Sequence, residues 1–158
     1  KRRNKFIVMM LSPHFSLKEM TQSQTALRAG ITNDPNGSQI YYIKHLCTNI
    51  LEPLREYYEV PIKITSGYRS QALCELIKSS PQSQHCANNG AAADFEIPTY
   101  DNKEVASHIK NNFDFDQLIL EYYDKSDKNS GWIHCSLKID NNRKESLMKD
   151  DKGYHQWS

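Results

Sequence analysis

The chain has 158 residues, of which 38% are hydrophobic, so it is long enough to build one domain around one core. Its 20 basic and 19 acidic residues leave a net charge of +1, so no overall field attracts it to nucleic acid or to an anionic membrane. Composition therefore excludes a strongly basic nucleic-acid-binding protein and favours a single globular domain, which we expect to be a monomer.

The N-terminal segment KRRNKFIVMML has four basic residues among its first five, followed by a short apolar run from Phe6 to Leu11. That run is shorter than the ~7 to 15 apolar residues of a signal peptide, and no A-x-A-like cleavage site follows it. We interpret residues 1–11 as a basic arm, with a degenerate targeting signal as the alternative, and residues 12–158 as one domain. No other segment approaches a ~20-residue membrane span, so we expect synthesis in the cytoplasm and no membrane insertion.

Two helical segments are predicted in the first third of the chain. In SPHFSLKEM, Ser16 is the expected N-cap of a short helix, and Glu19 three residues later completes a capping box. The segment GITNDPNGSQ then forms a loop. From Ser38 to about Tyr58 apolar residues recur at helical spacing, which predicts the principal core helix, and Pro53 is expected to kink or divide it.

The later part of the chain alternates predicted strands and helices. We expect strands at residues 62–65, 91–97, 115–123 and 131–137, and helices at 70–76 and 101–112. The polar segment DKSDKNS separates the last two strands, which indicates a hairpin with a long connection. Helices first and strands later predict an α+β domain, with helices packed on one face of a mostly antiparallel sheet. The other face is then free to carry a site.

The four cysteines follow no C-x-x-C spacing, which argues against a zinc knuckle or a thioredoxin-like motif. Two of them come directly after histidines. On a strand, neighbouring side chains point to opposite faces, so a cysteine that follows a site residue is expected to point into the core. We interpret all four as buried thiols, with a metal ligand or a disulfide as the alternative: Cys47, Cys74, Cys86 and Cys135.

The segment SQHCANNGAAADF places a histidine and an aspartate on either side of a turn. If residues 91–97 are extended, Asp94 lies on one face and Phe95 on the opposite, core-facing side. Ala92 leaves room beside the carboxylate, and the Asn-Asn-Gly turn allows His85 to fold back toward it. Alone, this pair fits either a hydrogen-bonded His–Asp pair or one half of a metal site.

A third candidate ligand lies on the strand GWIHCSL. Trp132, His134 and Ser136 share one face of that strand, and the opposite face is apolar. Two histidines and one aspartate, with a fourth position for water, match the three-protein-ligand arrangement of a catalytic zinc site. A structural zinc site would be expected to have four protein ligands, usually including cysteine.

Four motifs in order, PIKITSGYRS, SQHCANNGAAADF, FDQLILE and GWIHCSL, resemble the zinc D-Ala-D-Ala peptidases of the M15 type. The segments SPHFSLKEMTQSQTALRAGITNDP and NILEPLRE resemble their small bacterial and phage-encoded branch. The similarity spans about residues 12–147, and the order of the motifs makes it specific. It implies the hedgehog/DD-peptidase fold, one Zn²⁺ per chain and a peptidoglycan stem peptide as substrate.

The family motif S-x-H-x-x-G-x-A-x-D, carried onto this chain, implies that His85 and Asp94 are zinc ligands. The W-x-H strand implies His134 as the third ligand. This chain departs from the motif at two points. Four residues instead of two separate His85 from Gly90, an insertion that a loop can absorb. Many relatives also carry an acid three residues before the last histidine, where this chain has Gly131.

The same resemblance assigns residues to the substrate. Ser83 matches the motif serine that lies beside the bound peptide, and we assign Tyr68 and Trp132 to substrate binding as well. Arg69 in SGYRS matches the family arginine that holds a substrate or transition-state oxygen. A guanidinium suits that role because it is always charged and offers a planar fork of donors. The alternative is a surface arginine paired with a nearby acid.

A zinc hydrolase also needs a base that takes a proton from water and passes it to the leaving amine. Glu121, at the end of FDQLILE, is our candidate and resembles the same glutamate in the small branch. If the two last predicted strands pair across their loop, Glu121 lies opposite Trp132. Ile119 then lies opposite His134, so Glu121 and His134 share a face. The alternative is a solvated glutamate at a strand end; weaker candidates for the base are Asp116, Asp124 and Asp127.

These residues lead to the interpretation of a zinc metallopeptidase that hydrolyses D-amino-acid bonds in peptidoglycan stem peptides. It would act as a DD-carboxypeptidase or endopeptidase at the bacterial cell wall, released as a phage endolysin or carried as a virion lysin. One alternative is an inactive wall-binding or phage structural module, which Gly131 and the insertion favour. Another is a cytosolic D-Ala-D-Ala dipeptidase, which the missing signal sequence favours.

Overall fold

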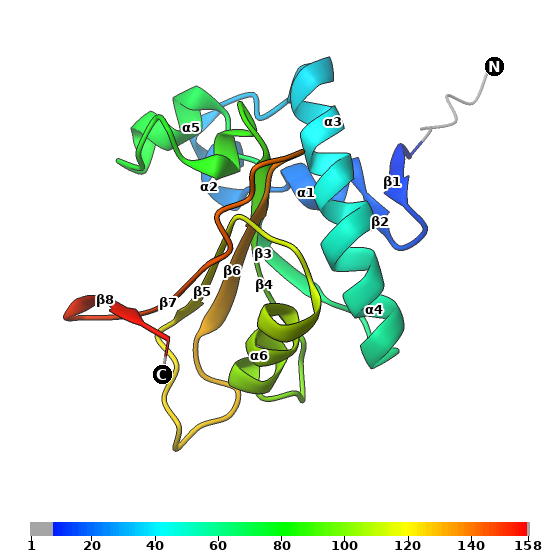
Figure 1. Cartoon of the computed structure of the whole chain (residues 1–158). Coiled ribbons are helices and arrows are strands. Elements are labelled where there is room, and N and C mark those ends of the chain that lie inside the picture. The colour runs from blue at the N-terminus through cyan, green and yellow to red at the C-terminus, as the bar shows by residue number, and fades with distance from the viewer. Residues whose placement is uncertain (1–7, 158) are drawn as a thin grey trace.

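The computed structural model of the chain describes residues 8–157 (Figure 1). Most of the predicted basic arm, residues 1–7, lies outside the described residues. Within the described part, strand β1 (Met10–Ser12) pairs with β2 (Phe15–Ser16), and Leu11 between them is buried in the core. The last residue assigned to the arm therefore packs with the rest of the domain.

A six-stranded sheet forms the centre of the molecule, with the strand order β3-β4-β6-β5-β7-β8. Every pair of neighbours is antiparallel except β5 and β7, which run parallel. The mostly antiparallel sheet expected from the sequence is therefore confirmed. The strands are β3 (Lys63–Ser66), β4 (Ala91–Glu96), β5 (Gln117–Glu121), β6 (Trp132–Leu137), β7 (Glu145–Asp150) and β8 (Gly153–Gln156).

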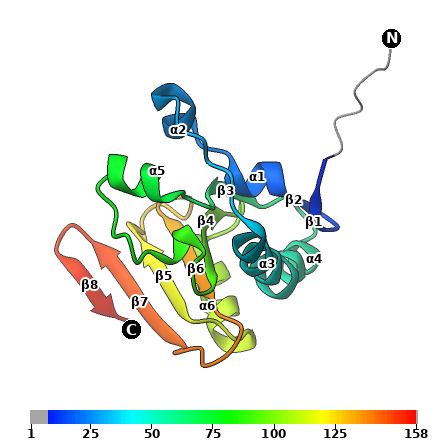
Figure 2. The ribbon, with the colours of Figure 1, turned by 90° about the horizontal axis from the view of Figure 1, so that it is seen from above.

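In the part of the chain that the structure describes, six α-helices surround this sheet: α1 (Leu17–Thr21), α2 (Gln24–Ala29), α3 (Gly37–Leu46), α4 (Glu52–Tyr58), α5 (Gln71–Leu76) and α6 (Asn102–Asn112). Figures 1 and 2 show α3, α4 and α6 on one side of the sheet and α5 on the other. The expectation that helices cover a single face holds for these three helices and is wrong for α5. The combination of helices with a mostly antiparallel sheet confirms the α+β class.

The principal core helix predicted from residue 38 to 58 is divided, as the proline indicated. A π-helical turn, Cys47–Leu51, separates α3 from α4, and the Glu52 N–H bonds the Cys47 carbonyl five residues earlier. Pro53 follows directly and has no N–H, so the regular ladder cannot continue through it. The apolar stripe still faces the core over both halves, with Ile43, Leu46, Ile50 and Leu54 all buried.

Alternation along the central strands separates the core from the site. Ala93 and Phe95 of β4 are fully buried, as are Ile133 and Cys135 of β6, and they belong to one hydrophobic core with α3 and α6. Asp94 lies between Ala93 and Phe95 and points to the opposite face. The parity predicted for this strand is confirmed, and the face turned away from the long helices carries polar side chains.

Several elements were not predicted from the sequence, among them the β1–β2 pair. No element was assigned to the residues of helix α2, where the Ser23 hydroxyl accepts a hydrogen bond from Ala26 N–H and caps the helix. Strands β7 and β8 extend the sheet beyond β5, where no further strand was expected. Strand β3 starts at Lys63 and not at Ile62, a difference of one residue.

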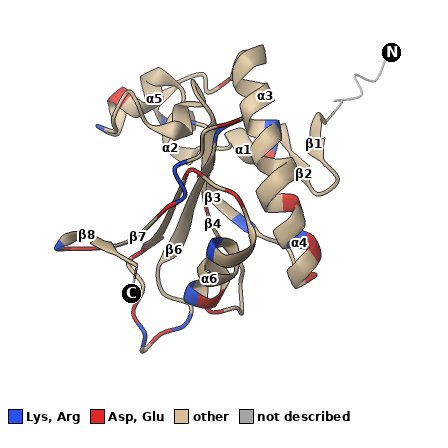
Figure 3. Cartoon of the chain, in the orientation of Figure 1, with Lys and Arg blue, Asp and Glu red and all other residues tan. Residues whose placement is uncertain are grey.

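Basic and acidic residues are interspersed along the helices and loops (Figure 3). This mixing agrees with the net charge of +1. No helix between residues 8 and 157 has the length and apolar content that crossing a membrane requires.

Candidate metal centre and its cavity

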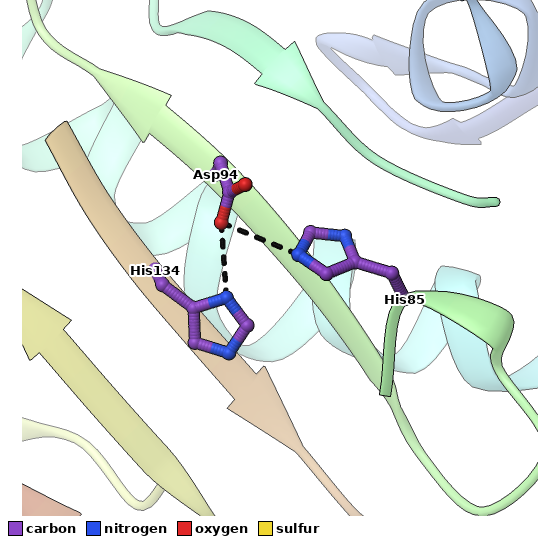
Figure 4. Close-up of side chains that lie close together, drawn as sticks. All are labelled: His85, Asp94 and His134. Atoms are coloured by element: carbon purple, nitrogen blue, oxygen red, sulfur yellow. Dashed lines mark hydrogen bonds and ion pairs between the residues drawn. The ribbon is translucent and has the colours of Figure 1, made fainter. Parts of the chain in front are cut away.

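Three side chains from separate parts of the chain converge on the polar face of the sheet: His85, Asp94 and His134 (Figure 4). Asp94 Oδ1 lies 2.9 Å from His134 Nδ1 and 3.3 Å from His85 Nε2. One ligand atom from each residue lies within 4.8 Å of the other two. The structure therefore brings together the three residues that the sequence singled out as metal ligands.

Strand register places two of the three. Asp94 on β4 is the direct cross-strand partner of His134 on β6, so both side chains emerge on the same face. His85 comes from a 3-10 turn, Gln84–Cys86, which Ser83 caps by accepting a hydrogen bond from the His85 N–H. The inserted residues after this turn are accommodated by left-handed backbone at Ala87 and Gly90.

Hydrogen bonds behind the cluster fix its orientation. The Nδ1–H of His85 donates to the Gly67 carbonyl at 2.7 Å, which leaves Nε2 directed toward Asp94. Gly67 can occupy this position because a Cβ there would lie 2.2 Å from the Met20 carbonyl oxygen. Arg69 donates from its terminal nitrogen to Asp94 Oδ2 at 3.3 Å, so Oδ1 remains on the side of the two histidines.

The electrostatic environment favours the protonation states that a divalent metal requires. Burial lowers the pKa of His85, in opposition to the nearby Asp94 carboxylate, and so favours the neutral imidazole. Burial acts to raise the pKa of Asp94, but hydrogen bonds from His134 and His85 and their charges hold it below its usual value. Neutral imidazoles and an ionised carboxylate are the forms that bind zinc, so these residues fit such an ion.

The cluster lies in a cavity of about 610 Å³. Of the residues assigned to substrate or catalysis, Arg69, Ser83, Glu121 and Trp132 all line it. Tyr68 does not. It is buried, its hydroxyl donates to Gln39 Oε1, and it lines an adjacent cavity of about 540 Å³ on the other side of Arg69.

Glu121 lies at the edge of the cluster with the strand register predicted for it. It pairs with Trp132 across β5 and β6, and Ile119 pairs with His134. The Trp132 indole Nε1–H donates to Glu121 Oε2 at 2.7 Å. Burial and the charge of Asp94 raise the pKa of Glu121, although His134, the indole hydrogen bond and Lys149 act against this shift. A carboxylate with a raised pKa is a stronger proton acceptor.

The weaker candidates for the base, all within the described residues, do not line this cavity. Asp116 is buried and accepts hydrogen bonds from Arg143 and Gln84. Burial acts to raise its pKa, but the Arg143 hydrogen bonds lower it to about 2. Asp124 and Asp127 lie in the exposed connection between β5 and β6, where they accept hydrogen bonds from backbone N–H groups of that loop.

Gly131, the departure from the family pattern, has a structural reason. Its φ of +69° is left-handed, and a Cβ there would lie 2.2 Å from the Glu121 carbonyl oxygen. An acidic side chain at position 131 would therefore clash with the backbone that holds Glu121. In this chain the acid beside the cluster comes from β5.

The four cysteines are free and buried. Cys135 lies on the core face of β6 and Cys86 directly follows His85, so neither belongs to the cluster. The interpretation of buried thiols is confirmed for the structure, and a metal-ligand role is not supported. Cys74 and Cys86 lie in contact, with their Sγ atoms 2.9 Å apart.

Sequence reasoning missed the contribution of the last two strands and of the segment before them to the cavity. Arg143 before β7, Lys149 on β7 and Tyr154 on β8 line it together with the predicted residues. Because β7 and β8 were not predicted, the sequence offered no register that would bring these side chains to the site. The sequence near the C-terminus contains only a short segment of polar and aromatic residues, which does not by itself predict strands.

Two histidines and an aspartate beside a partly buried carboxylate form an arrangement typical of mononuclear metallohydrolases. The family model described as Peptidase M15 matches residues 13–136, which include the cluster and Glu121. The chain therefore belongs to the M15 peptidase family. Its members are generally zinc peptidases of the D-Ala-D-Ala carboxypeptidase type. Among curated proteins, no sequence matches the chain significantly.

Proposed function

We propose that the chain is a zinc-dependent D,D-peptidase that hydrolyses bonds between D-amino acids in peptidoglycan stem peptides, as a carboxypeptidase or a cross-link endopeptidase. The observation that carries this proposal is the His85–Asp94–His134 cluster beside Glu121 in one cavity. All of these residues lie within the part of the chain that the family model matches. The α+β sheet and the family together support the hedgehog/DD-peptidase fold as its architecture.

Zinc would be held by the nitrogens that face Asp94, Nε2 of His85 and Nδ1 of His134, together with the Asp94 carboxylate. When bound, zinc supplies a Lewis acid that polarises a carbonyl group and makes water more acidic. Buried ligands and the hydrogen bond from His85 to Gly67 hold these side chains in place before the ion binds.

Glu121 would carry the proton. Trp132 holds Oε2 through the indole hydrogen bond, which leaves Oε1 to accept a proton from the attacking water and to return it to the leaving amine. Arg69 has its guanidinium at the cluster edge, where it would stabilise the oxyanion or hold the terminal carboxylate of the substrate. Ser83 and Trp132 line the cavity where the peptide would lie.

The alternative of an inactive wall-binding module drew support from Gly131 and from the insertion after His85. Because the backbone at Gly131 cannot carry an acid and Glu121 lines the same cavity as the cluster, that departure no longer argues against catalysis. We propose further that the chain acts as a monomer at the bacterial wall, delivered as a phage endolysin or a virion lysin.

Digestion of purified peptidoglycan, followed by mass spectrometry of the muropeptides, tests this function. A carboxypeptidase would remove one alanine from pentapeptide stems, and an endopeptidase would convert cross-linked dimers into monomers. A chelator should stop either reaction and zinc should restore it. Bound zinc and wall binding without new amino groups would favour the binding module. Faster hydrolysis of free D-Ala-D-Ala than of wall would favour the dipeptidase.

A further inference from the structure

Four side chains form a row across the polar face of the sheet: Trp132, Glu121, Lys149 and Tyr154. Glu121 pairs with Trp132 on one side and with Lys149 on the other, and Lys149 pairs with Tyr154. All four line the cavity of the metal cluster. Lys149 and Tyr154 belong to β7 and β8, which lie beyond the residues matched by the family model.

The contacts of the Lys149 ammonium group within the protein do not use all of its hydrogen-bond donors. Its Nζ lies 3.8 Å from Glu121 Oε1, which is longer than a hydrogen bond, and 5.2 Å from the centroid of the Tyr154 ring. An ammonium group carries three donors, so at least one remains for a ligand in the cavity. The Lys149 side chain is 31% exposed and therefore accessible.

The two arginines of the cavity lie elsewhere. Arg69 pairs with Asp94 at 3.3 Å and is assigned to the reacting end of the substrate, and Arg143 pairs with the buried Asp116 at 2.7 Å. Lys149, whose contact with Glu121 is longer at 3.8 Å, is left as the cation for an anionic group farther along the substrate. Because the Glu121 carboxylate repels another anion, that group would lie on the Tyr154 side of the ammonium.

We propose that Lys149 and Tyr154 form a subsite for a free carboxylate on the peptide substrate. Neighbouring strands lie ~4.8 Å apart, so Tyr154 is about 10 Å from Glu121 across the row. An extended peptide advances ~3.3 Å per residue, which places this carboxylate two to three residues from the cleaved bond. The subsite rests on the proposed function. It specifies the preferred substrate of that function, which is a stem peptide whose glutamate carboxyl group is free and not amidated.

Two peptides ending in D-Ala-D-Ala that differ only in this group, carboxylate or carboxamide, test the subsite. We expect kcat/KM to favour the carboxylate peptide about tenfold, mainly through KM, since a charged hydrogen bond is lost in the other. Lys149→Met should abolish the preference and Lys149→Arg should retain most of it. Lys152→Met removes the same charge from the turn of the same hairpin and should keep the full preference.

The outcomes separate the subsite from the proposed function. If the wild-type chain hydrolyses neither these peptides nor cross-linked dimers that carry the same two groups, the peptidase proposal itself is contradicted. Equal hydrolysis of both peptides by the wild type would overturn the subsite alone. The subsite would also be overturned if Lys149→Met kept the preference for the carboxylate peptide and only moved the acidic limb of the pH profile to higher pH. In that case Lys149 would act through its charge on Glu121 and not by contact with the substrate. Thermal unfolding of each variant confirms that it folds.

A different observation carries a second inference, which does not depend on the activity. Cys74 lies on α5, Cys86 directly follows His85, and their Sγ atoms lie 2.9 Å apart inside the protein. A disulfide has an S–S bond of ~2.0 Å, so about 1 Å of movement closes it. Residues 79–84 between the two cysteines include Ser83 and form one rim of the cavity.

We infer that Cys74 and Cys86 form a disulfide by exchange with a disulfide donor such as oxidised glutathione. One cysteine thiolate attacks the donor and releases its first thiol, and the second cysteine then attacks the mixed disulfide and releases the other. The chain loses two hydrogens and the donor gains them. Both thiols are buried in the folded domain, so exchange proceeds before the domain closes.

Refolding in a glutathione redox buffer, followed by mass spectrometry of peptides, tests the pair. We expect a mass loss of ~2 Da, two alkylatable thiols instead of four after denaturation, and a Tm higher by roughly 5 to 10 °C. Cys74→Ser should abolish all three changes, and Cys47→Ser should preserve the crosslink. Four free thiols after refolding, or a crosslink that includes Cys47 or Cys135, would overturn the inference.

Discussion

Glu121→Gln is expected to lower turnover at least about a hundredfold while zinc content and Tm remain at wild-type values. Glutamine keeps the size of the side chain, and its amide oxygen can still accept the hydrogen bond from Trp132 Nε1. It cannot accept a proton in the reaction, so binding persists while chemistry slows. Steady-state hydrolysis of a stem peptide, elemental analysis and thermal unfolding measure the three quantities.

The pH profile gives the same experiment a second readout. Because burial and the charge of Asp94 raise the pKa of Glu121 above the usual range of a glutamate, the proposed base is deprotonated, and active, only above that raised value. The acidic limb of kcat/KM should therefore lie at a higher pH than an ordinary glutamate would give, and it should be absent from the residual activity of Glu121→Gln.

Asp127→Asn is the matched control, since it makes the same acid-to-amide change in the exposed loop after β5. We expect turnover close to that of the wild type. Should Asp127→Asn lose turnover while Glu121→Gln keeps it, the base is a loop acid and the role given to Glu121 is wrong.

His85→Ala, Asp94→Ala and His134→Ala are each expected to lose bound zinc and activity, because each removes one of three protein ligands. In the wild type, a chelator should remove activity and added zinc should restore it. Elemental analysis of the purified variants measures the metal directly, and thermal unfolding shows which variants remain folded. The prediction concerns metal content first, so it does not depend on the identity of the substrate.

His14→Ala is a control of the same chemical kind outside the cluster. His14 Nδ1 pairs with Glu52 at 2.6 Å, so this variant also breaks a histidine–carboxylate pair. We expect it to keep one zinc per chain. Stoichiometric zinc retained by any of the three cluster variants would remove that residue from the ligand set.

The placement of the candidate site was predictable where strand parity decides it. Alternation of apolar and polar residues sends Asp94 and His134 to the face opposite Phe95 and Cys135. The register that puts Glu121 opposite Trp132 followed from pairing two strands across one loop, and the structure confirms it. In both cases a local pattern was sufficient, because one face had to be buried.

Other features depended on contacts that no local pattern specifies. Strand β7 is mostly polar and only partly buried. It follows β6 after a connection of several residues and pairs in parallel with β5. Its place, and with it the position of Lys149, is set by tertiary packing. Tyr68 is a neighbour of Arg69 in sequence, yet its ring turns into the interior toward Gln39 and lines a different cavity.

The pairing of Asp94 with His134 also sets the order in which the domain assembles. These residues are 40 positions apart in the chain and meet only when β6 pairs with β4. Such long-range pairing forms late, because loop closure costs entropy before the contacts compensate for it. Zinc binding to the proposed ligands would therefore follow folding of the sheet, unlike in small zinc fingers, whose folding begins with the metal. We expect the chain to fold without zinc and to accept the ion afterwards.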